Sequence, residues 1–381
     1  MKTTSILQTQ NRLSLVRKQR GARTAFLLIA LLSFSLPLSA QQKLSLLFVG
    51  DAMQHIPQIT AAKTATGYDY KDCFVHIKEE IQAADIAVVN LETTHAGKPF
   101  SGYPTFSAPD EFSIDLKDAG FDIFLTANNH CADKGRKGIE RTIDVLDSLK
   151  VRHTGTFKDS AQYNLHYPLM IVKNGFKLAF LNYTYSTNDM PVYAPNIVNI
   201  INDKVILRDV EKAKLYKPDI IIVCLHWGQE YMRLPNNEQK RLAKLLTDNG
   251  VKLVIGSHPH VIQPMEAVKN IDGRIEHVTA YSLGNFISNQ KDRYTDSGAI
   301  VKIELQKDES GETEISDCRY SLVWRYKYTE NGKLNYTLIP ASIYDNNPEI
   351  VQPALRPQMK SAFDDARALL NKHNINVPEE K

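Results

Sequence analysis

The feature that most constrains this 381-residue chain is a series of short apolar runs, each ending at a glycine or at polar residues. Runs this short and rich in β-branched residues favour buried strands. Segments with apolar residues three or four positions apart lie between the runs and predict helices. The alternation predicts an α/β fold whose sheet carries helices on its faces. The predicted strands cover residues 43–49, 85–89, 121–125, 220–225 and 251–255.

Helical spacing is clearest in three segments, which cover residues 74–81, 139–146 and 242–246. Beyond residue 300 the pattern changes to strands separated by glycine turns, followed by a helix over Pro357 to Lys372. We therefore expect a main domain over 44–300 and a small β-rich extension with a terminal helix over 301–381. Residues 188–202 are poorly patterned and predict a loop, either over a site or without function.

Residues 1–40 have the organisation of an export signal. They carry six Lys or Arg and no Asp or Glu, and cations precede a short apolar run over 25–32. The run is shorter than the ~20 residues that a bilayer span needs, and the small residues Ser39-Ala40 suit cleavage. We expect cleavage after Ala40 and an exported protein, periplasmic or extracellular. The alternative is anchoring through an uncleaved N-terminal segment.

The charge of the remaining residues speaks against a nucleic-acid partner. The whole chain has 46 Lys and Arg against 43 Asp and Glu, so the part after residue 40 is mildly acidic. A nucleic-acid binder of this size would be expected to carry a broad basic field.

The four cysteines, Cys73, Cys131, Cys224 and Cys318, are widely spaced. Export permits disulfides, and four cysteines allow three pairings. No two of them form a C-x-x-C pair, so a zinc ribbon has no support. Cys224 lies within a predicted strand and is expected to be a buried free thiol.

Polar side chains with metal-binding chemistry follow the ends of five predicted strands. The carboxyl ends of strands in an α/β sheet are where ligand sites gather. Taken singly, each residue has an ordinary structural explanation, such as a turn, a helix cap or a buried histidine. Together they predict a site for one or two divalent ions, and their mixed carboxylate, amide and imidazole donors suit Mn, Fe or Zn. The residues are Asp51, Glu92, Asn129, His130, His226, His258 and His260.

Six short motifs carry these residues in order along the chain. They are Gly50-Asp51-Ala52-Met53, Asn90-Leu91-Glu92, Ala127-Asn128-Asn129-His130 with Asp133 and Gly135, His226-Trp227-Gly228-x-Glu230-Tyr231, Gly256-Ser257-His258-Pro259-His260 and Tyr281-Ser282-Leu283-Gly284-Asn285-Phe286. The set resembles the capsule-synthesis CapA family, also called poly-γ-glutamate synthesis proteins. That family resembles the calcineurin-like metallophosphoesterases. The resemblance implies an α/β fold in which a calcineurin-like metallophosphatase β-sandwich is flanked by helices.

The resemblance also implies a role for each site residue. Asp51 and His260 match ligands of a first metal, and Glu92 matches a bridging carboxylate. The ligands expected at a second metal are Asn129, His226 and His258. His130 matches the acid that protonates a leaving oxygen, so His130 and Asp51 are the expected catalytic residues.

Two aromatic residues near these motifs are candidates for substrate binding. Trp227 and Tyr231 are expected to form an apolar or sugar-stacking wall, with core packing as the alternative. The segment from Tyr281 to Phe286 is expected to close the floor of the site, although its Gly284-Asn285 turn also fits a purely structural role.

One position departs from the phosphoesterase pattern. Met53 stands two residues after Asp51, where typical phosphoesterases carry a metal-binding histidine, and a thioether is a poor ligand for a hard cation. His55 lies nearby, but its spacing is wrong for the same geometry. A weak or absent first metal is therefore the expected consequence.

Two classes of function fit the sequence. The first is an exported metal-dependent phosphoesterase linked to synthesis of capsule, poly-γ-glutamate or another envelope polymer. Its partners would be a phosphate-bearing or anionic envelope polymer and a membrane synthesis or export complex. The second is a non-hydrolytic accessory protein of polymer synthesis or export, favoured by Met53 and by the lack of phosphate in poly-γ-glutamate. Amide hydrolysis by the same metals is a third reading, which ligand type does not distinguish.

Overall fold

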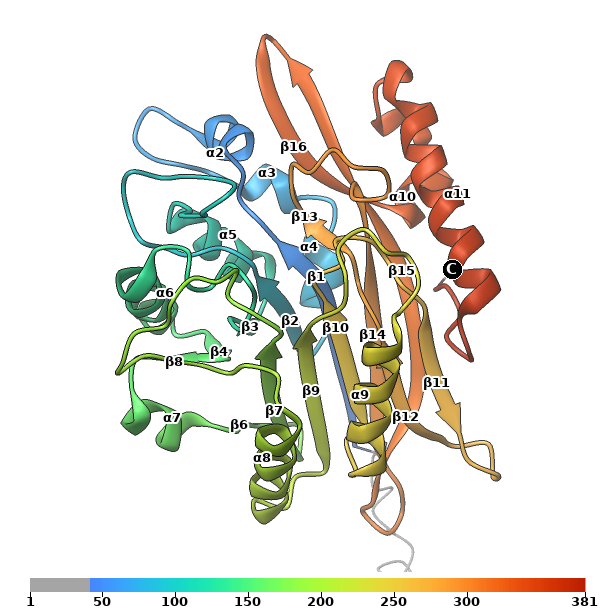
Figure 1. Cartoon of the computed structure of the whole chain (residues 1–381). Helices are drawn as coiled ribbons and strands as arrows, with labels where there is room; N and C mark the ends of the chain where they lie inside the picture. Colours follow the sequence, from blue (N-terminus) through green and yellow to red (C-terminus); the bar gives the residue numbers. More distant parts are fainter. Residues whose placement is uncertain (1–41, 381) are drawn as a thin grey trace, which may run out of the picture. The chain divides into compact units, whose positions relative to one another are not determined.

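Residues 42–380 are described by a computed structural model, shown in Figure 1. The export signal expected over residues 1–40 lies outside the described residues. Within residues 42–380, none of the helices combines the length and apolar character needed to cross a membrane.

Fourteen strands form one hydrogen-bonded sheet with the order β4-β3-β2-β1-β14-β15-β12-β10-β9-β7-β6. To this path β11 adds on β12, β13 on β1 and β16 on β15. The strands are β1 (Lys43–Ala52), β2 (Ile86–Leu91), β3 (Ile123–Leu125), β4 (Arg152–Thr154), β6 (Leu169–Lys173), β7 (Phe176–Thr184), β9 (Ile220–His226), β10 (Leu253–Ser257), β11 (Met265–Lys269), β12 (Ile275–Ala280), β13 (Asn285–Ile287), β14 (Ser297–Lys307), β15 (Thr313–Glu330) and β16 (Lys333–Pro340). A separate short pair joins β5 (Thr156–Phe157) and β8 (Ile197–Val198).

Helices occupy most of the connections between these strands. They are α2 (Ile56–Ala62), α3 (Lys71–Phe74), α4 (Lys78–Gln82), α5 (Glu111–Ala119), α6 (Gly135–Leu149), α7 (Ser160–His166), α8 (Asp203–Leu215), α9 (Asn237–Asp248), α10 (Ala341–Asn346) and α11 (Arg356–His373). Short 3-10 helices at Pro348–Ile350 and Pro353–Leu355 precede α11.

The alternating side chains of β1 show how the sheet is layered. Leu46 and Phe48 belong to the same apolar core as Phe180 of β7 and Ile222 of β9. Leu47, on the opposite face of β1, packs in a second core with residues of α3, α4 and α5. Successive side chains of a strand point to opposite faces, so β1–β3 share an inner core with β7, β9 and β10 and carry helices on the outside. This arrangement confirms the predicted β-sandwich flanked by helices.

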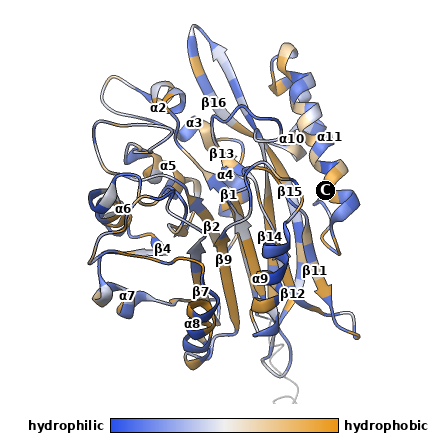
Figure 2. Ribbon diagram, in the orientation of Figure 1, coloured by the Kyte–Doolittle hydropathy of each residue, from blue (hydrophilic) through white to orange (hydrophobic). Residues whose placement is uncertain are grey.

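The other half of the sheet is covered in the same way. Val223 of β9 packs with Val210 of α8 and Leu246 of α9 in a third core. Figure 2 shows the hydrophobic colour concentrated in strands such as β9, while α8 carries both colours. The helices therefore turn one apolar stripe to the sheet, as expected for amphipathic surface helices.

The C-terminal strands extend the main sheet. β14 runs antiparallel to β1, with Leu46 opposite Ile303, and β15 and β16 follow as further antiparallel neighbours. Asn331 and Gly332, with φ of 52° and 76°, form the turn between β15 and β16, as Asn-Gly does in tight hairpins. The apolar side of α11 packs on these strands through residues such as Phe363, and this helix corresponds to the predicted terminal helix.

The structure corrects one predicted helix and gives the state of the four cysteines. The helical pattern over 74–81 is not one helix: α3 ends at Phe74 and α4 begins at Lys78, with a turn between them. All four cysteines are buried and free, Cys224 among them. No disulfide therefore links any pair of them within residues 42–380.

Candidate metal centre

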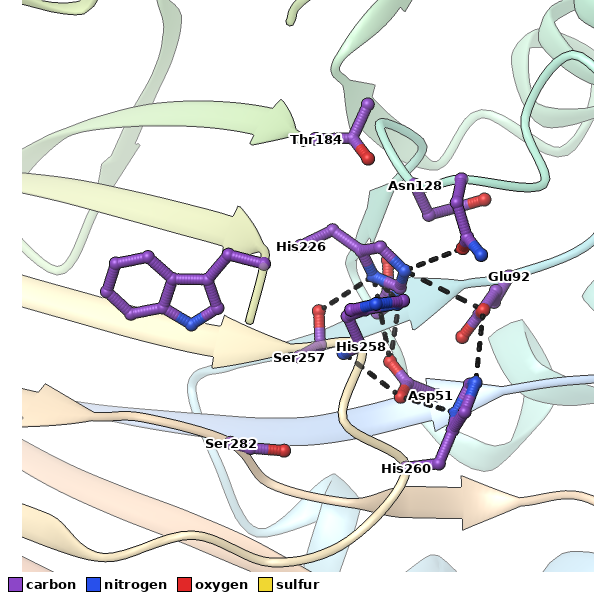
Figure 3. Close-up of polar contacts among 12 residues, drawn as sticks. Asp51, Glu92, Asn128, Thr184, His226, Ser257, His258, His260 and Ser282 are labelled. Carbon is purple, nitrogen blue, oxygen red and sulfur yellow. Dashed lines mark hydrogen bonds and ion pairs between the residues drawn. The ribbon is translucent and has the colours of Figure 1, made fainter. Parts of the chain in front are cut away.

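The ends of the central strands bring six of the predicted site residues into one cluster (Figure 3). β1, β2 and β3 are parallel to one another, as are β7, β9 and β10. Their carboxyl ends therefore deliver side chains that lie far apart in the sequence to one place. All six side chains belong to residues that are at most 2% exposed: Asp51, Glu92, Asn129, His226, His258 and His260.

Glu92 lies at the middle of this cluster. Its Oε1 atom is 3.7 Å from Nε2 of His226 and 3.9 Å from Nε2 of His260. Both carboxylate oxygens of Glu92 are buried and lack a hydrogen-bond partner. Burial raises the pKa of Glu92 well above its usual range, and the neighbouring Asp51 carboxylate raises it further. A buried acid in this state is compensated most directly by a cation.

Both ring nitrogens of His226 have a side-chain partner. Its Nε2 atom is 2.8 Å from Oδ1 of Asn129, and its Nδ1 atom is 3.2 Å from Oγ of Ser257. Burial lowers the pKa of His226 well below its usual range, and the neighbouring imidazoles add to the shift. A neutral imidazole is the form that ligates a metal. Donor atoms that share one ion lie roughly 3–4 Å apart, which matches the spacing around His226 and Glu92.

Asp51 is fixed by groups from three other segments. The Asn90 side-chain amide donates to its Oδ1 at 2.7 Å, and the His258 backbone N–H donates to its Oδ2 at 3.3 Å. Nδ1 of His260 lies 3.2 Å from the same Oδ2 and 3.1 Å from Oδ1 of Asn285. Asn285 is in position because β13 pairs with β1 and sets it opposite Asp51. The orientation of the carboxylate is thus set before any ligand binds.

His258 and His260 flank Pro259 in an unusual backbone conformation. Their φ angles are 99° and 59°, in the left-handed region that residues other than glycine rarely adopt. The His258 ring packs against that of Tyr185, with centroids 4.4 Å apart. Burial and the nearby imidazole of His260 lower the pKa of His258 to about 3. Strained backbone of this kind is concentrated at functional sites.

His130 lies beside the cluster and is paired with an acid. Its Nδ1 atom is 2.8 Å from Oδ2 of Asp133. The Asn128 side-chain oxygen accepts the His130 backbone N–H at 3.1 Å, and the Phe106 ring meets the imidazole edge-on. The pair resembles an acid–base group whose ring orientation is held by a carboxylate.

A cavity of about 660 Å³ opens above these residues. His130, His260 and Met53 line it together with Tyr231 and Glu230. Two residues of the poorly patterned 188–202 loop, Asn188 and Met190, also line the cavity, and Asn129 donates to the Asn188 side-chain oxygen at 3.3 Å. That part of the loop therefore borders the site.

The two aromatic residues expected to bind substrate have different positions. Tyr231 lines the cavity and is partly exposed. Trp227 is buried in the core between the sheet and α9, and its indole N–H donates to the backbone oxygen of Tyr281 at 2.9 Å. The expected role of Trp227 in a substrate wall is therefore corrected: its ring packs in the core and does not line the cavity.

Met53 is buried at the end of the cluster that contains His260. The Nδ1 atom of His55 is engaged, since it lies 3.3 Å from Oε1 of Gln58 and accepts the Asn289 backbone N–H at 3.3 Å, and the residue lines the same cavity as Met53.

Sequence reasoning missed the residues that orient the expected ligands. Asn90, Asn285, Asp133 and Glu230 all lie within the quoted motifs or next to them, but no function was expected of them. The signal for Asn90 was its position near the end of β2, two residues before Glu92, which directly follows the strand. Asp133 follows His130 by only three residues, whereas Asn285 and Glu230 depend on contacts between distant segments, which no local pattern reveals.

A family model and two curated relatives that match this chain are all described as capsule or PGA synthesis proteins. The model of the family described as bacterial capsule synthesis protein PGA_cap matches residues 45–290. Capsule biosynthesis protein CapA of Bacillus anthracis is 28% identical over 330 residues, which cover 82% of this chain and 71% of that protein. PGA biosynthesis protein CapA of Bacillus subtilis is 28% identical over 288 residues, covering 72% and 70%.

Similarity to solved structures is more distant. NAD nucleotidase of Haemophilus influenzae is 11% identical with a TM-score of 0.48, covering 89% of this chain and 64% of that one. A 5′-nucleotidase of Candida albicans is 9% identical with a TM-score of 0.38, covering 67% and 46%. This chain thus spans less than two thirds of either structure, and a likeness at this level says nothing of its activity.

Proposed function

Because this chain belongs to the bacterial capsule synthesis protein PGA_cap family, we propose that it is a metal-dependent phosphoesterase of capsule or envelope-polymer synthesis. The observation that carries the proposal is the buried Glu92 carboxylate, whose two oxygens have no hydrogen-bond partner and face the imidazoles of His226 and His260. An unpaired buried carboxylate costs several kcal/mol. A bound cation offsets that cost; without one, Glu92 would have to keep a proton, as its raised pKa permits.

The cluster has the donors for one or two divalent cations. The residues that would hold them are Asp51, Glu92, Asn129, His226, His258 and His260. Carboxylate, amide and imidazole groups together suit Mn, Fe or Zn. When bound, such a cation supplies positive charge for phosphoryl oxygens and makes a water more acidic.

His130 is the proposed proton donor. Asp133 holds its Nδ1 atom at 2.8 Å, which leaves Nε2 as the nitrogen that can give a proton to a departing alkoxide. The same cavity is lined by His130 and His260, so a substrate bound there reaches the acid and one of the proposed metal ligands together. Burial of the cluster excludes bulk water and strengthens the electrostatic interactions within it.

The proposed substrate is a phosphate-bearing or otherwise anionic envelope polymer. A second cavity, of about 450 Å³, adjoins the first and shares Gln290, Lys291 and Asp292 with it. Its lining has four cationic residues, Lys291, Arg293, Arg325 and Lys327, against three carboxylates, Asp292, Asp296 and Asp365. A polymer longer than one unit could therefore extend from the metal centre onto cationic side chains, which favours an anionic chain. Export through residues 1–40 and a membrane synthesis complex as partner belong to the same proposal.

The test is metal analysis combined with hydrolysis. Untagged protein, purified without chelators, should contain Mn, Fe or Zn and should cleave an activated phosphodiester. His130→Asn should retain the metal and lose most of the rate, because it removes the proposed acid without touching a ligand. Protein that contains no metal and stays inactive with every added divalent cation would exclude the proposal.

A non-hydrolytic accessory role in polymer synthesis or export is the second candidate, and Met53 favours it. The thioether occupies a position where the phosphoesterase pattern has an imidazole, and it is buried in the site. Binding of an acidic polymer with equal affinity by wild type and His258→Ala, without hydrolysis, would support this role. Loss of polymer binding in His258→Ala would favour the metal-centred function.

A further inference from the structure

The part of the site around Met53 lacks one expected donor. Met53 lines the cavity together with His260 but offers only a thioether. The Nδ1 atom of His55 is engaged by Gln58 and by the Asn289 backbone N–H. A further hard donor from another segment would compensate, on this side of the site, for the imidazole that Met53 does not supply.

Glu230 brings a carboxylate to this place from the loop after β9. Glu230, His258 and His260 each offer a ligand atom, and these atoms all lie within 4.8 Å of one another. The two imidazoles are buried and Glu230 is exposed, so the carboxylate closes the open side of the histidine pair. Glu230 also lines the cavity that contains Met53.

An independent observation at His258 also indicates a ligand. Its Nδ1 atom is buried and has no hydrogen-bond partner, although the residue is only 2% exposed. A buried polar atom without a partner is unfavourable unless a bound group satisfies it. His258 and the Glu230 carboxylate belong to one cluster.

A backbone hydrogen bond joins the loop that carries Glu230 to the loop that carries His258 and His260. The Tyr231 N–H donates to the Pro259 oxygen at 2.8 Å, which ties the residue after Glu230 to the residue between the two histidines. Tyr231 has a φ of 66°, so it adopts the same left-handed region as His258 and His260. Three residues other than glycine in this conformation, on two joined loops, indicate a geometry maintained for a site.

From these observations we infer that Glu230 is a metal ligand of this protein, supplying with His258 and His260 the hard donor that Met53 does not. The inference rests on the proposed metal centre and adds a ligand to it. It explains how a site with methionine at this position holds a cation beside Asp51 and Glu92.

The test measures metal affinity and needs no substrate. The full chain is stripped with a chelator and titrated with Zn²⁺ and Mn²⁺ by calorimetry. E230Q should bind at least about 10-fold more weakly than wild type, as loss of a metal-centre group does. Glu309→Gln, which changes an exposed glutamate in the loop between β14 and β15, is the matched control and should bind as wild type does. The Co²⁺ absorption spectrum of E230Q should also differ from that of wild type.

A rescue variant checks the link to Met53. Met53→His in the E230Q background should recover most of the lost affinity, because it restores an imidazole at the same side of the site. Wild-type affinity in E230Q, with binding lost in Glu92→Gln, overturns this inference and leaves the metal centre intact. Wild type that binds neither cation overturns the inference and the proposed function together. E230Q is at an exposed position, so its metal-free melting temperature should equal that of wild type.

Discussion

The Nδ1 atom of His130 lies 2.8 Å from Oδ2 of Asp133, and the Phe106 backbone N–H donates to the same oxygen at 2.6 Å. The Asp133 carboxylate therefore connects the imidazole to the segment that ends at Phe106, whose Tyr103, Pro104 and Thr105 line the cavity. Its position fixes the ring before substrate arrives, which makes Asp133 a positioning residue for the proposed acid.

Asp133→Asn should lower kcat for an activated phosphodiester by about 10- to 100-fold, while His130→Asn should lower it by about 10²- to 10⁴-fold. KM and metal content should change little in either variant, since neither residue is a proposed ligand. Steady-state kinetics with metal analysis of the same samples makes the measurement. A rise in KM with unchanged kcat in Asp133→Asn would contradict the positioning role.

Glu92→Gln should have opposite effects on the metal-free and the metal-loaded protein. Without metal, the amide removes a buried carboxylate that has no partner, so the free energy of unfolding should rise by about 1–3 kcal/mol. With metal, the variant should lose the stabilisation that wild type gains on binding. Thermal denaturation with and without added Zn²⁺ reads both effects. A variant that is less stable than wild type without metal would show that Glu92 is a structural residue.

His95 should make stability depend on pH. Burial lowers its pKa to about 4, against the opposing effect of Asp110 and with a smaller contribution from Arg141 in the same direction as burial. Its Nε2 atom lies 2.7 Å from Oγ of Ser113. The unfolded chain takes up the proton as pH falls below about 6.5, while the folded chain resists until about pH 4. Stability should therefore fall across this window by up to about 3 kcal/mol from His95 alone.

The measurement is urea denaturation of metal-free protein at several pH values between 8 and 4. His95→Gln should show a shallower loss of stability than wild type across the window, whatever its stability at pH 8. His166→Gln, which changes an exposed histidine, should keep the wild-type slope. Equal slopes in all three proteins would show that His95 does not remain neutral in the fold.

The lysines of the second cavity should affect the binding of long substrates alone. Lys291→Gln and Lys327→Gln should raise KM for an anionic polymer and reduce its dependence on salt. Lys327→Gln should not affect a small activated phosphodiester, which does not reach beyond the first cavity, whereas Lys291 lines both cavities. Lys240→Gln, an exposed change on α9, is the control. Equal effects on both substrates would place the polymer elsewhere.

Sequence patterns predicted the site residues that lie at the ends of strands. A run such as 43–49 gives both the strand and, because strand ends gather at one edge, the place of Asp51. The same reasoning brings His226 and His258 to one site from separate segments. These predictions rest on period and on turn chemistry, which are local properties of the chain.

Contacts between distant segments could not be predicted in this way. The pairing of Asp51 with Asn285 depends on β13 joining β1, and the position of Glu230 depends on a hydrogen bond between two loops. Trp227 follows His226 directly, yet its ring packs against Tyr281 in the core. Adjacent side chains of an extended segment point to opposite faces, so the neighbour of a ligand is more often a core residue than a second site residue.

The most direct measurement is anomalous diffraction from crystals of untagged protein grown with Mn²⁺, recorded on either side of the Mn absorption edge. The proposed metal centre predicts a Mn²⁺ peak within bonding distance of Glu92, with further ligands among Asn129, His226, His258, His260 and Glu230. A difference map with no peak beside Glu92 at saturating Mn²⁺, repeated with Zn²⁺ at its own edge, would contradict it.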